Sequence, residues 1–295
     1  MPIRPLPVLL LLCGTAQGLF TVHRVPHPTI GIAQPSAAQL RWMDLELGAM
    51  ISYGIGMPNA PWVPPNTTCF GNFSAPPAGL FNCTPNFAQW TRAFQALGAK
   101  YSVIAASGGC GYALWPSQAK FPDGTTYNYS TAQSPLLGMP DIMRAYVDAM
   151  TASNIGTGVY FQLEYDYWGG FLHGSMSPNG PGAPKLSAEE YFNVTTQMLA
   201  EVWDPDRYGN HTELWFDGGL VGWSASAVAA VAALMKRLQP GAVAFQGEST
   251  CREIQICWQL QAVSSHASYR VFQNDFGFSC CDRSDYGRSS AMDWQ

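Results

Sequence analysis

Charged side chains are scarce in this chain, and their scarcity excludes one large class of partners. Only 12% of the 295 residues are charged, and 15 basic against 20 acidic side chains leave a net charge of −5. A protein that binds nucleic acid needs a basic surface to neutralise phosphates. We therefore expect no nucleic-acid partner.

Several sequence motifs are also missing. No Cys-x-x-Cys pair or histidine cluster is present, which argues against a zinc site. No Gly-x-Gly-x-x-Gly follows a predicted strand, which argues against a dinucleotide-binding fold. No apolar run is long enough to cross a hydrocarbon layer of about 30 Å, so we expect no membrane span.

The first residues have the pattern of a secretory signal. Arg4 supplies the positive charge, residues 8–12 form a short apolar core, and Ala16 and Gly18 are small residues suited to cleavage after Gly18. We expect residues 1–18 to be a signal peptide and residues 19–295 one catalytic domain. The protein is then secreted, or delivered to a lysosome- or vacuole-like compartment.

Glycosylation sequons and cysteines favour the same compartment. Eight cysteines suit an oxidising environment in which disulfides form. N-glycans are predicted at six Asn-x-Ser/Thr sites: Asn66, Asn72, Asn82, Asn128, Asn193 and Asn210.

Apolar strands alternate with amphipathic helices through the middle of the chain. Helices are expected over 37–47, 87–97, 139–153, 188–202 and 225–238. Strands are expected over 49–54, 100–106, 158–163, 213–217 and 242–246. This alternation predicts an α/β fold with a parallel sheet, either a (β/α)8-type barrel or a doubly wound open sheet.

Acidic side chains stand where the predicted strands end. Functional side chains of a (β/α) barrel lie at the carboxyl ends of its strands. Asp217 ends one strand, follows Trp215 and Phe216, and precedes two glycines that let the backbone turn and a ligand approach. Catalysis is one interpretation of Asp217, and a turn or helix-capping aspartate is the other.

Hydrolysis of a glycosidic bond needs a second carboxyl group besides the first. Glu248, just after a strand, and Glu253 are candidates for the acid/base. Glu164 is a third candidate, although the segment from Glu164 to Trp168 could instead line a sugar pocket. Ten Trp and thirteen Tyr residues provide rings that can stack on sugars, although most rings in any protein are core.

These segments, in this order, resemble the α-L-fucosidases of glycoside hydrolase family 29, in particular the plant-like and microbial branch. The similarity runs over residues of about 28 to 250. It is carried by residues 36–51, 89–101, 112–117 and the Glu-Leu-Trp-Phe-Asp-Gly of residues 213–218.

The resemblance implies a retaining exo-glycosidase that releases terminal α-linked L-fucose from glycans, without a metal or an organic cofactor. It implies that Asp217 is the nucleophile. The residues expected to bind the substrate are Tyr53, Trp115, Glu164, Tyr165, Trp168 and Trp215.

The chain departs from the family pattern in two places. Ser52, Gly108 and Gly109 stand where the family has pocket histidines that would bond sugar hydroxyls. This leaves two alternatives open: a non-catalytic, lectin-like sugar-binding barrel, and a glycosidase for a different sugar. The family's barrel continues beyond the length of this chain and a β-sandwich domain usually follows, so we expect a barrel incomplete at its C-terminus.

Overall fold

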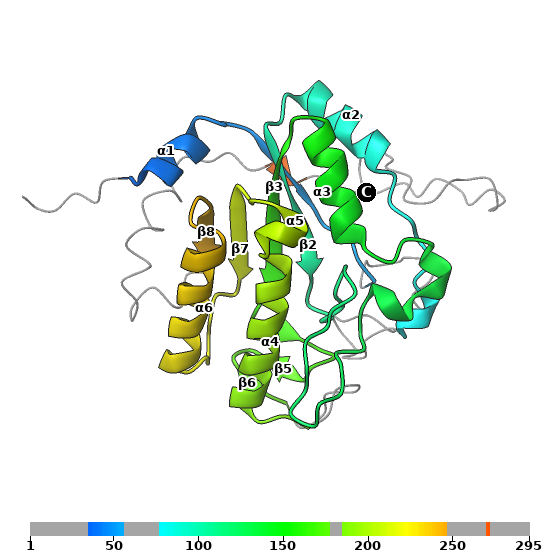
Figure 1. Ribbon diagram of the computed structural model, residues 1–295, viewed down its shortest axis with the longest axis vertical. Helices are drawn as coiled ribbons and strands as arrows, with labels where there is room; N and C mark the ends of the chain where they lie inside the picture. The colour runs from blue at the N-terminus through cyan, green and yellow to red at the C-terminus, as the bar shows by residue number, and fades with distance from the viewer. Residues whose placement is uncertain (1–34, 56–76, 178–184, 247–269, 272–295) are drawn as a thin grey trace, which may run out of the picture. The chain divides into compact units, whose positions relative to one another are not determined.

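A parallel sheet forms the centre of the fold. The computed structural model describes residues 35–55, 77–177, 185–246 and 270–271. Six strands form the sheet in the order β8-β7-β3-β2-β1-β9, and each neighbouring pair is parallel. Figure 1 shows helices α3, α4 and α6 side by side in front of this sheet.

The strands of the sheet are β1 (Gly48–Ile51), β2 (Tyr101–Ser107), β3 (Gly156–Gln162), β7 (Glu213–Asp217), β8 (Val243–Gln246) and β9 (Arg270–Val271). The α-helices are α1 (Ala37–Met43), α2 (Phe87–Leu97), α3 (Ile142–Ala152), α4 (Ala188–Val202), α5 (Pro205–Tyr208) and α6 (Ala225–Leu238). Short 3-10 helices η1 (Ala78–Leu80), η2 (Thr131–Gln133) and η3 (Pro135–Leu137) lie in the connections.

The strand order decides between the two fold classes expected from the sequence. Strands β1, β2, β3, β7 and β8 follow one another across the sheet in chain order, whereas a doubly wound sheet reverses direction at a switch point. The chain then returns and places β9 beside β1, as a barrel does when its last strand meets its first. The described residues thus form an incomplete (β/α)8-type barrel.

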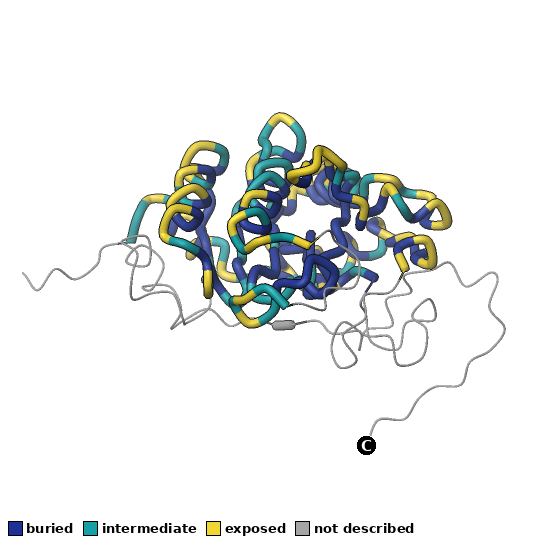
Figure 2. The backbone as a smooth tube through the Cα atoms, turned by 90° about the horizontal axis from the view of Figure 1, so that it is seen from below, coloured by how far each residue is buried: buried dark blue, intermediate teal, exposed yellow. Residues whose placement is uncertain are grey.

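Three helices have the bounds that the sequence predicts, because their ends are encoded locally. Asn86 and Ser224 accept bonds from backbone N–H groups in the first turns of α2 and α6. Ser187 and Glu190 form the predicted capping box of α4. Each helix buries one side against the sheet and exposes the other, as the tube in Figure 2 shows.

Two apolar layers pack on opposite faces of the sheet. The larger one fills the space between sheet and helices, with Ile104, Val159 and Leu214 fully or almost fully buried. The smaller one lies on the other face, where Trp42 of α1 packs with Tyr101. Alternate residues of each strand enter each layer, so strand position determines which face a side chain reaches.

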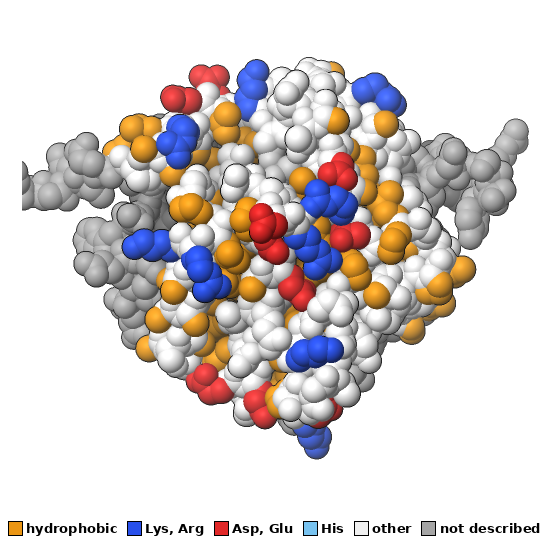
Figure 3. Space-filling view, in the orientation of Figure 1, with side chains coloured by type: hydrophobic (Ala, Val, Ile, Leu, Met, Phe, Trp, Pro, Cys, Tyr) orange, Lys and Arg blue, Asp and Glu red, His pale blue; other side chains and the backbone are white. Residues whose placement is uncertain are grey.

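The outer surface of the helices carries charges of both signs. Figure 3, in the orientation of Figure 1, shows acidic and basic side chains interspersed there. Arg207 of α5 lies 3.3 Å from Asp141, and Arg144 of α3 lies 3.2 Å from Asp148. The Arg144–Asp148 pair is exposed, and such pairs contribute little to stability.

Some local features differ from the sequence expectation. Helix α1 ends at Met43, and Glu46 then adopts a left-handed φ of 59°. Helix α3 starts at Ile142 because Asp141 is its N-cap. A small antiparallel sheet of β4 (Tyr165–Asp166), β5 (Phe171–Leu172) and β6 (Ser175–Met176) was not predicted. Among the described residues, no helix has the length and apolar character needed to cross a membrane.

Candidate active site

Asp217 lies at the carboxyl end of β7, next to Gln162 on β3. The two residues are register partners in the parallel sheet. Leu214 and Phe216 are buried on the helix side, so the alternation along β7 places Glu213, Trp215 and Asp217 together on the inner face. Strand geometry therefore aims Asp217 toward the mouth of the incomplete barrel.

Two donors from β3 hold one oxygen of the Asp217 carboxylate. The Tyr160 hydroxyl donates to Oδ2, and Gln162 Nε2 donates to the same atom at 3.2 Å. Burial, together with this bond and the charge of Asp217, raises the pKa of Tyr160, so its hydroxyl keeps its proton. Among the described residues, Oδ1 has no hydrogen-bond partner, which leaves it available to a ligand.

The two glycines after Asp217 adopt the conformation expected of them. Gly218 and Gly219 have φ of 72° and 65°, a left-handed region that favours glycine. A Cβ on Gly218 would lie 2.2 Å from the Cβ of Glu164. The backbone after Asp217 therefore passes directly against Glu164, and only glycine permits this approach.

Glu164 and Tyr165 follow β3 at the same edge of the sheet and are both partly exposed. Desolvation raises the pKa of Tyr165, and the carboxylates of Glu164 and Asp217 add to the rise. Glu164 Oε1 also lies 3.7 Å from His173 Nδ1. The structure thus brings Asp217, Glu164 and Tyr165 together, as their strand-end positions predict.

Tyr53 and Trp115, predicted to bind substrate, lie in the core instead. The Tyr53 side chain is on the helix side of β1, where its hydroxyl donates to the Cys83 carbonyl and its ring packs against Trp90. Trp115 is fully buried, and its Nε1 donates to Glu201 of α4 at 2.7 Å.

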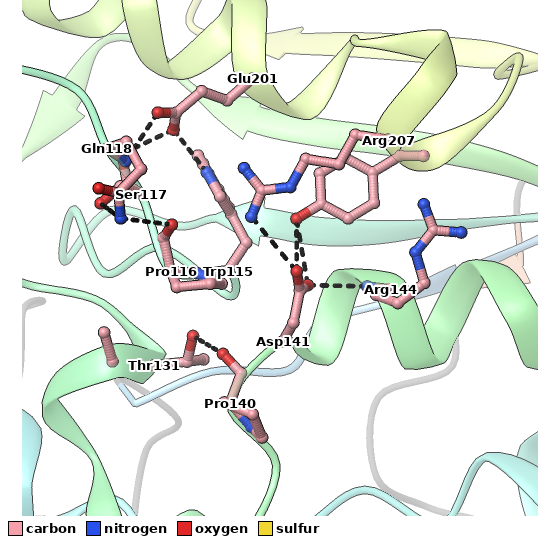
Figure 4. Close-up of polar contacts among 12 residues, drawn as sticks. Trp115, Pro116, Ser117, Gln118, Thr131, Pro140, Asp141, Arg144, Glu201 and Arg207 are labelled. Atoms are coloured by element: carbon pink, nitrogen blue, oxygen red, sulfur yellow. Dashed lines mark hydrogen bonds and ion pairs between the residues drawn. The ribbon is translucent and has the colours of Figure 1, made fainter.

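Figure 4 shows how Glu201 gathers the segment around Trp115. The carboxylate of Glu201 also accepts from Ser117 Oγ and the Gln118 backbone N–H, each at 2.7 Å. This cluster fastens the Trp-Pro-Ser segment to α4, so Trp115 has a structural role and we leave it and Tyr53 out of the site.

The two other predicted tryptophans differ in exposure. Trp168 is buried, 7% exposed, and stacks on Tyr129 at 5.3 Å between ring centroids, so it is also a core residue. Trp215 is partly exposed on the inner face and packs against Tyr160 and Phe245. Trp215 therefore supports Tyr160, the residue that holds Asp217.

Two buried acids were not among the predicted site residues. Glu213 is fully buried at the other end of β7, and burial raises its pKa to about 7 against the hydrogen bonds of Trp42 and Tyr101. Desolvation also raises the pKa of Asp166 to about 7, although Gly169, Tyr191 and Trp168 donate to it. Both acids are buried and hydrogen-bonded to neighbouring residues of the core, so we assign both to the fold.

The remaining predicted positions divide into two groups. Glu248 and Glu253 lie outside the described residues. Ser52 is exposed, Gly108 is partly exposed, and a Cβ on Gly108 would have no described atom within 4 Å. A side chain at position 108 would therefore meet open space among the described residues.

Cys110, at the same edge of the sheet, is disulfide-bonded. It follows β2 in the segment that carries Gly108 and Gly109. A disulfide in this position restrains the loop that borders the site.

Comparisons with known proteins point to a single family. The family model described as alpha-L-fucosidase matches residues 78–295. The rice (Oryza sativa subsp. japonica) protein named "Putative alpha-L-fucosidase 1" is 30% identical over 224 residues, which cover 72% of this chain and 37% of the rice protein. The Arabidopsis thaliana "Alpha-L-fucosidase 1" is 25% identical over 197 residues, 65% of this chain and 32% of its own length. The chain thus spans about a third of the length of these relatives.

Solved structures show the same fold. A family 29 α-L-fucosidase from Bacteroides thetaiotaomicron superposes with a TM-score of 0.55 at 21% identity, over 72% of this chain and 48% of its own. An α-L-fucosidase from Lactobacillus casei, solved with α-L-fucose product, gives a TM-score of 0.53 at 15% identity, over 71% and 69%. The family model, which matches residues 78–295, and the rice relative show that this chain belongs to the α-L-fucosidase family, glycoside hydrolase family 29.

Proposed function

We propose that this chain is a retaining exo-α-L-fucosidase with Asp217 as its nucleophile. The observation that carries the proposal is the environment of the Asp217 carboxylate. Tyr160 and Gln162 fix Oδ2, while Oδ1 stays available at the carboxyl edge of the sheet. A carboxylate oriented by neutral donors is placed for attack without being neutralised by a cation.

The proposed reaction proceeds in two displacements at the anomeric carbon. Asp217 attacks this carbon of an α-linked fucosyl group while an acid gives its proton to the departing glycosidic oxygen. The C–O bond breaks, and an ester joins the sugar to Asp217. The same acid, now a base, then removes a proton from water. The water oxygen attacks the anomeric carbon, the bond from that carbon to Asp217 breaks, and fucose leaves with its original configuration.

The second carboxyl group has three candidates. Glu164 is the candidate among the described residues, since its side chain lies against Gly218, next to Asp217. Glu248 and Glu253 stay predictions. Retaining enzymes hold their two carboxyl groups about 5–5.5 Å apart, so the residue that acts must approach Asp217 closely.

Azide trapping tests the nucleophile and the acid/base together. With an activated aryl fucoside, Asp217→Gly is expected to be inactive until azide replaces the carboxylate and gives the inverted fucosyl azide. The acid/base variant, among Glu164→Gln, Glu248→Gln and Glu253→Gln, is expected to give the azide with retained configuration. If Asp217→Gly hydrolysed the aryl fucoside as fast as the wild type without azide, the assignment of the nucleophile would be wrong.

A non-catalytic sugar-binding protein is the second candidate, favoured by Ser52, Gly108 and Gly109 in place of histidines. A site that lacks donors for sugar hydroxyls loses recognition of the reacting sugar. This reading predicts calorimetric binding of a fucosylated glycan without release of fucose. Turnover of another aryl glycoside in preference to the fucoside would support the third reading, a glycosidase for a different sugar.

We also propose that the protein passes through a secretory compartment, carries N-glycans and acts on a fucosylated glycan or glycoprotein. Two observations support this proposal. The N-terminus has the pattern of a signal peptide, and four sequon asparagines are exposed: Asn82, Asn128, Asn193 and Asn210. Enzymatic removal of N-glycans from the secreted protein should lower its mass. An unchanged mass would contradict the glycosylation.

A further inference from the structure

His173, to which the sequence analysis gave no role, lies in a two-residue turn beside the candidate site. Leu172 pairs with Ser175 across the β5–β6 hairpin, so His173 and Gly174 alone form its turn. Their φ angles are 50° and 76°, both left-handed, as in a type I′ turn.

The residue at the first turn position is not the one that the turn itself prefers. Type I′ turns favour Asn-Gly, because both central residues need positive φ. Histidine is, with asparagine and aspartate, one of the non-glycine residues most often found at positive φ, so the turn accommodates His173. Its contacts, and not the turn, indicate what the imidazole does.

The imidazole of His173 lies beside Tyr165 and Glu164. Its Nδ1 is 2.8 Å from the Tyr165 hydroxyl, and the two rings meet edge to face at 4.5 Å. Glu164 Oε1 is 3.7 Å from the same nitrogen. The His173 side chain is 70% exposed, and its Nε2 has no hydrogen-bond partner in the described part of the chain. One nitrogen thus fixes the ring and the other is available to a ligand.

Glycine contacts tie this hairpin to the loop that follows Asp217. A Cβ on Gly222 would lie 1.8 Å from the Gly174 carbonyl oxygen. Gly218 packs against the side chain of Glu164, whose Oε1 lies 3.7 Å from His173 Nδ1. The loop that follows Asp217 therefore contacts the backbone of the turn through Gly222 and reaches His173 through Glu164.

A series of contacts leads outward from Asp217 to His173. Gly218, directly after Asp217, packs against Glu164, and Glu164 and Tyr165 contact His173, whose side chain is 70% exposed. In an exo-acting glycosidase the terminal sugar occupies the inner position. Groups farther out face the sugar that leaves.

We propose that His173 is a specificity-determining residue that hydrogen-bonds, through Nε2, a hydroxyl of the leaving-group sugar. This inference rests on the proposed fucosidase function. Tyr165, whose hydroxyl lies 2.8 Å from Nδ1, is the positioning residue for the ring.

The substitution His173→Asn removes the imidazole and keeps the turn, because asparagine suits the left-handed position at least as well. We compare kcat and KM for a fucosylated trisaccharide and for an aryl fucoside that has no leaving-group sugar. The kcat/KM ratio of trisaccharide to aryl fucoside is expected to fall about tenfold, mainly through KM, as for loss of one ligand hydrogen bond. Ser175→Ala, on the same hairpin, is the matched control.

Each outcome decides one question. A wild-type chain that cleaves neither substrate refutes the proposed function, and this assignment with it. A wild-type chain that cleaves both, with an unchanged ratio in His173→Asn, refutes only the role of His173, whether the two rates fall together or stay constant. A melting temperature at or above that of the wild type confirms that the turn is intact.

Discussion

The two ends of strand β7 carry carboxyl groups on the same face with opposite properties. Glu213, at the amino end, is fully buried, accepts from Trp42 Nε1 at 2.9 Å, and has a pKa raised to about 7. Asp217, at the carboxyl end, is partly exposed and held by Tyr160 and Gln162. Because both side chains point to the same face of β7, their burial and hydrogen-bond partners make the difference. These distinguish Glu213, which we assign to the fold, from Asp217, which we propose as the nucleophile.

The largest effect should come from removing the charge at the mouth. Asp217→Asn is expected to lower kcat/KM by about 10³-fold or more, since a nucleophile has no substitute in the site. Glu213→Gln, which neutralises the other end of β7 without changing its shape, should stay within a few-fold of wild type. Similar losses in both variants, measured with an aryl fucoside, would erase the contrast.

Truncation at the buried end should instead destabilise the fold. Glu213→Ala leaves the Trp42 N–H unpaired and opens a cavity, at a cost of about 3–4 kcal/mol in the free energy of unfolding. Denaturant titration measures this cost. Asp217→Ala, at the partly exposed end, is the control and should cost about 1 kcal/mol or less.

The dependence of stability on pH should reflect the two buried acids, Glu213 and Asp166. The pKa of Glu213 rises from 4.5 unfolded to about 7 folded, and that of Asp166 from 3.8 to about 7. The folded state therefore favours the protonated acids, so this stability is complete below about pH 4 and is lost as the pH rises through 7.

Each of these buried acids contributes on the order of 3 kcal/mol over that range. Thermal melting at pH 5 should exceed that at pH 8, and Glu213→Gln should flatten the profile. A wild-type profile that rises from pH 5 to 8 would contradict the burial of these groups as neutral acids.

The smallest effect concerns how Asp217 is held. Tyr160→Phe removes one of the two donors to Oδ2 and is expected to lower kcat about tenfold to a hundredfold, about 1.4–2.7 kcal/mol. Tyr146→Phe, in the helix layer, removes a buried hydroxyl remote from Asp217 and serves as the control. Equal kinetics in the two variants would mean that Tyr160 does not position the nucleophile.

Local signals explain what could be predicted from the sequence. Caps such as Ser187 lie within a few residues of the helices they start, and apolar β7 ends in an acid followed by glycines. These features predict the bounds of three helices and the place of Asp217. The alternation alone left a barrel and a doubly wound sheet both open, and the resemblance favoured the barrel. Tyr53 was misplaced because it lies one residue beyond Ser52, and successive residues of an extended chain point to opposite faces.

Contacts between distant residues could not be predicted in the same way. Trp115 contacts Glu201, which lies 86 residues later, and Trp42 contacts Glu213, which lies 171 residues later. The hairpin that carries His173 consists of two-residue strands without an Asn-Gly turn signal, so it resembled a loop. Its importance depends on packing against the segment after Asp217, which only the folded chain reveals.

The pairing of β9 with β1 has a consequence for how this chain is made. Ala49 and Met50 meet partners at Arg270 and Val271, more than two hundred residues later. At a synthesis rate of about 5–20 residues per second, the ribosome needs roughly 10–40 seconds to supply that partner. Until then the outer side of β1 has open backbone groups that another nascent chain can join. The time needed to translate the residues between β1 and β9 therefore sets how long this edge stays without its partner.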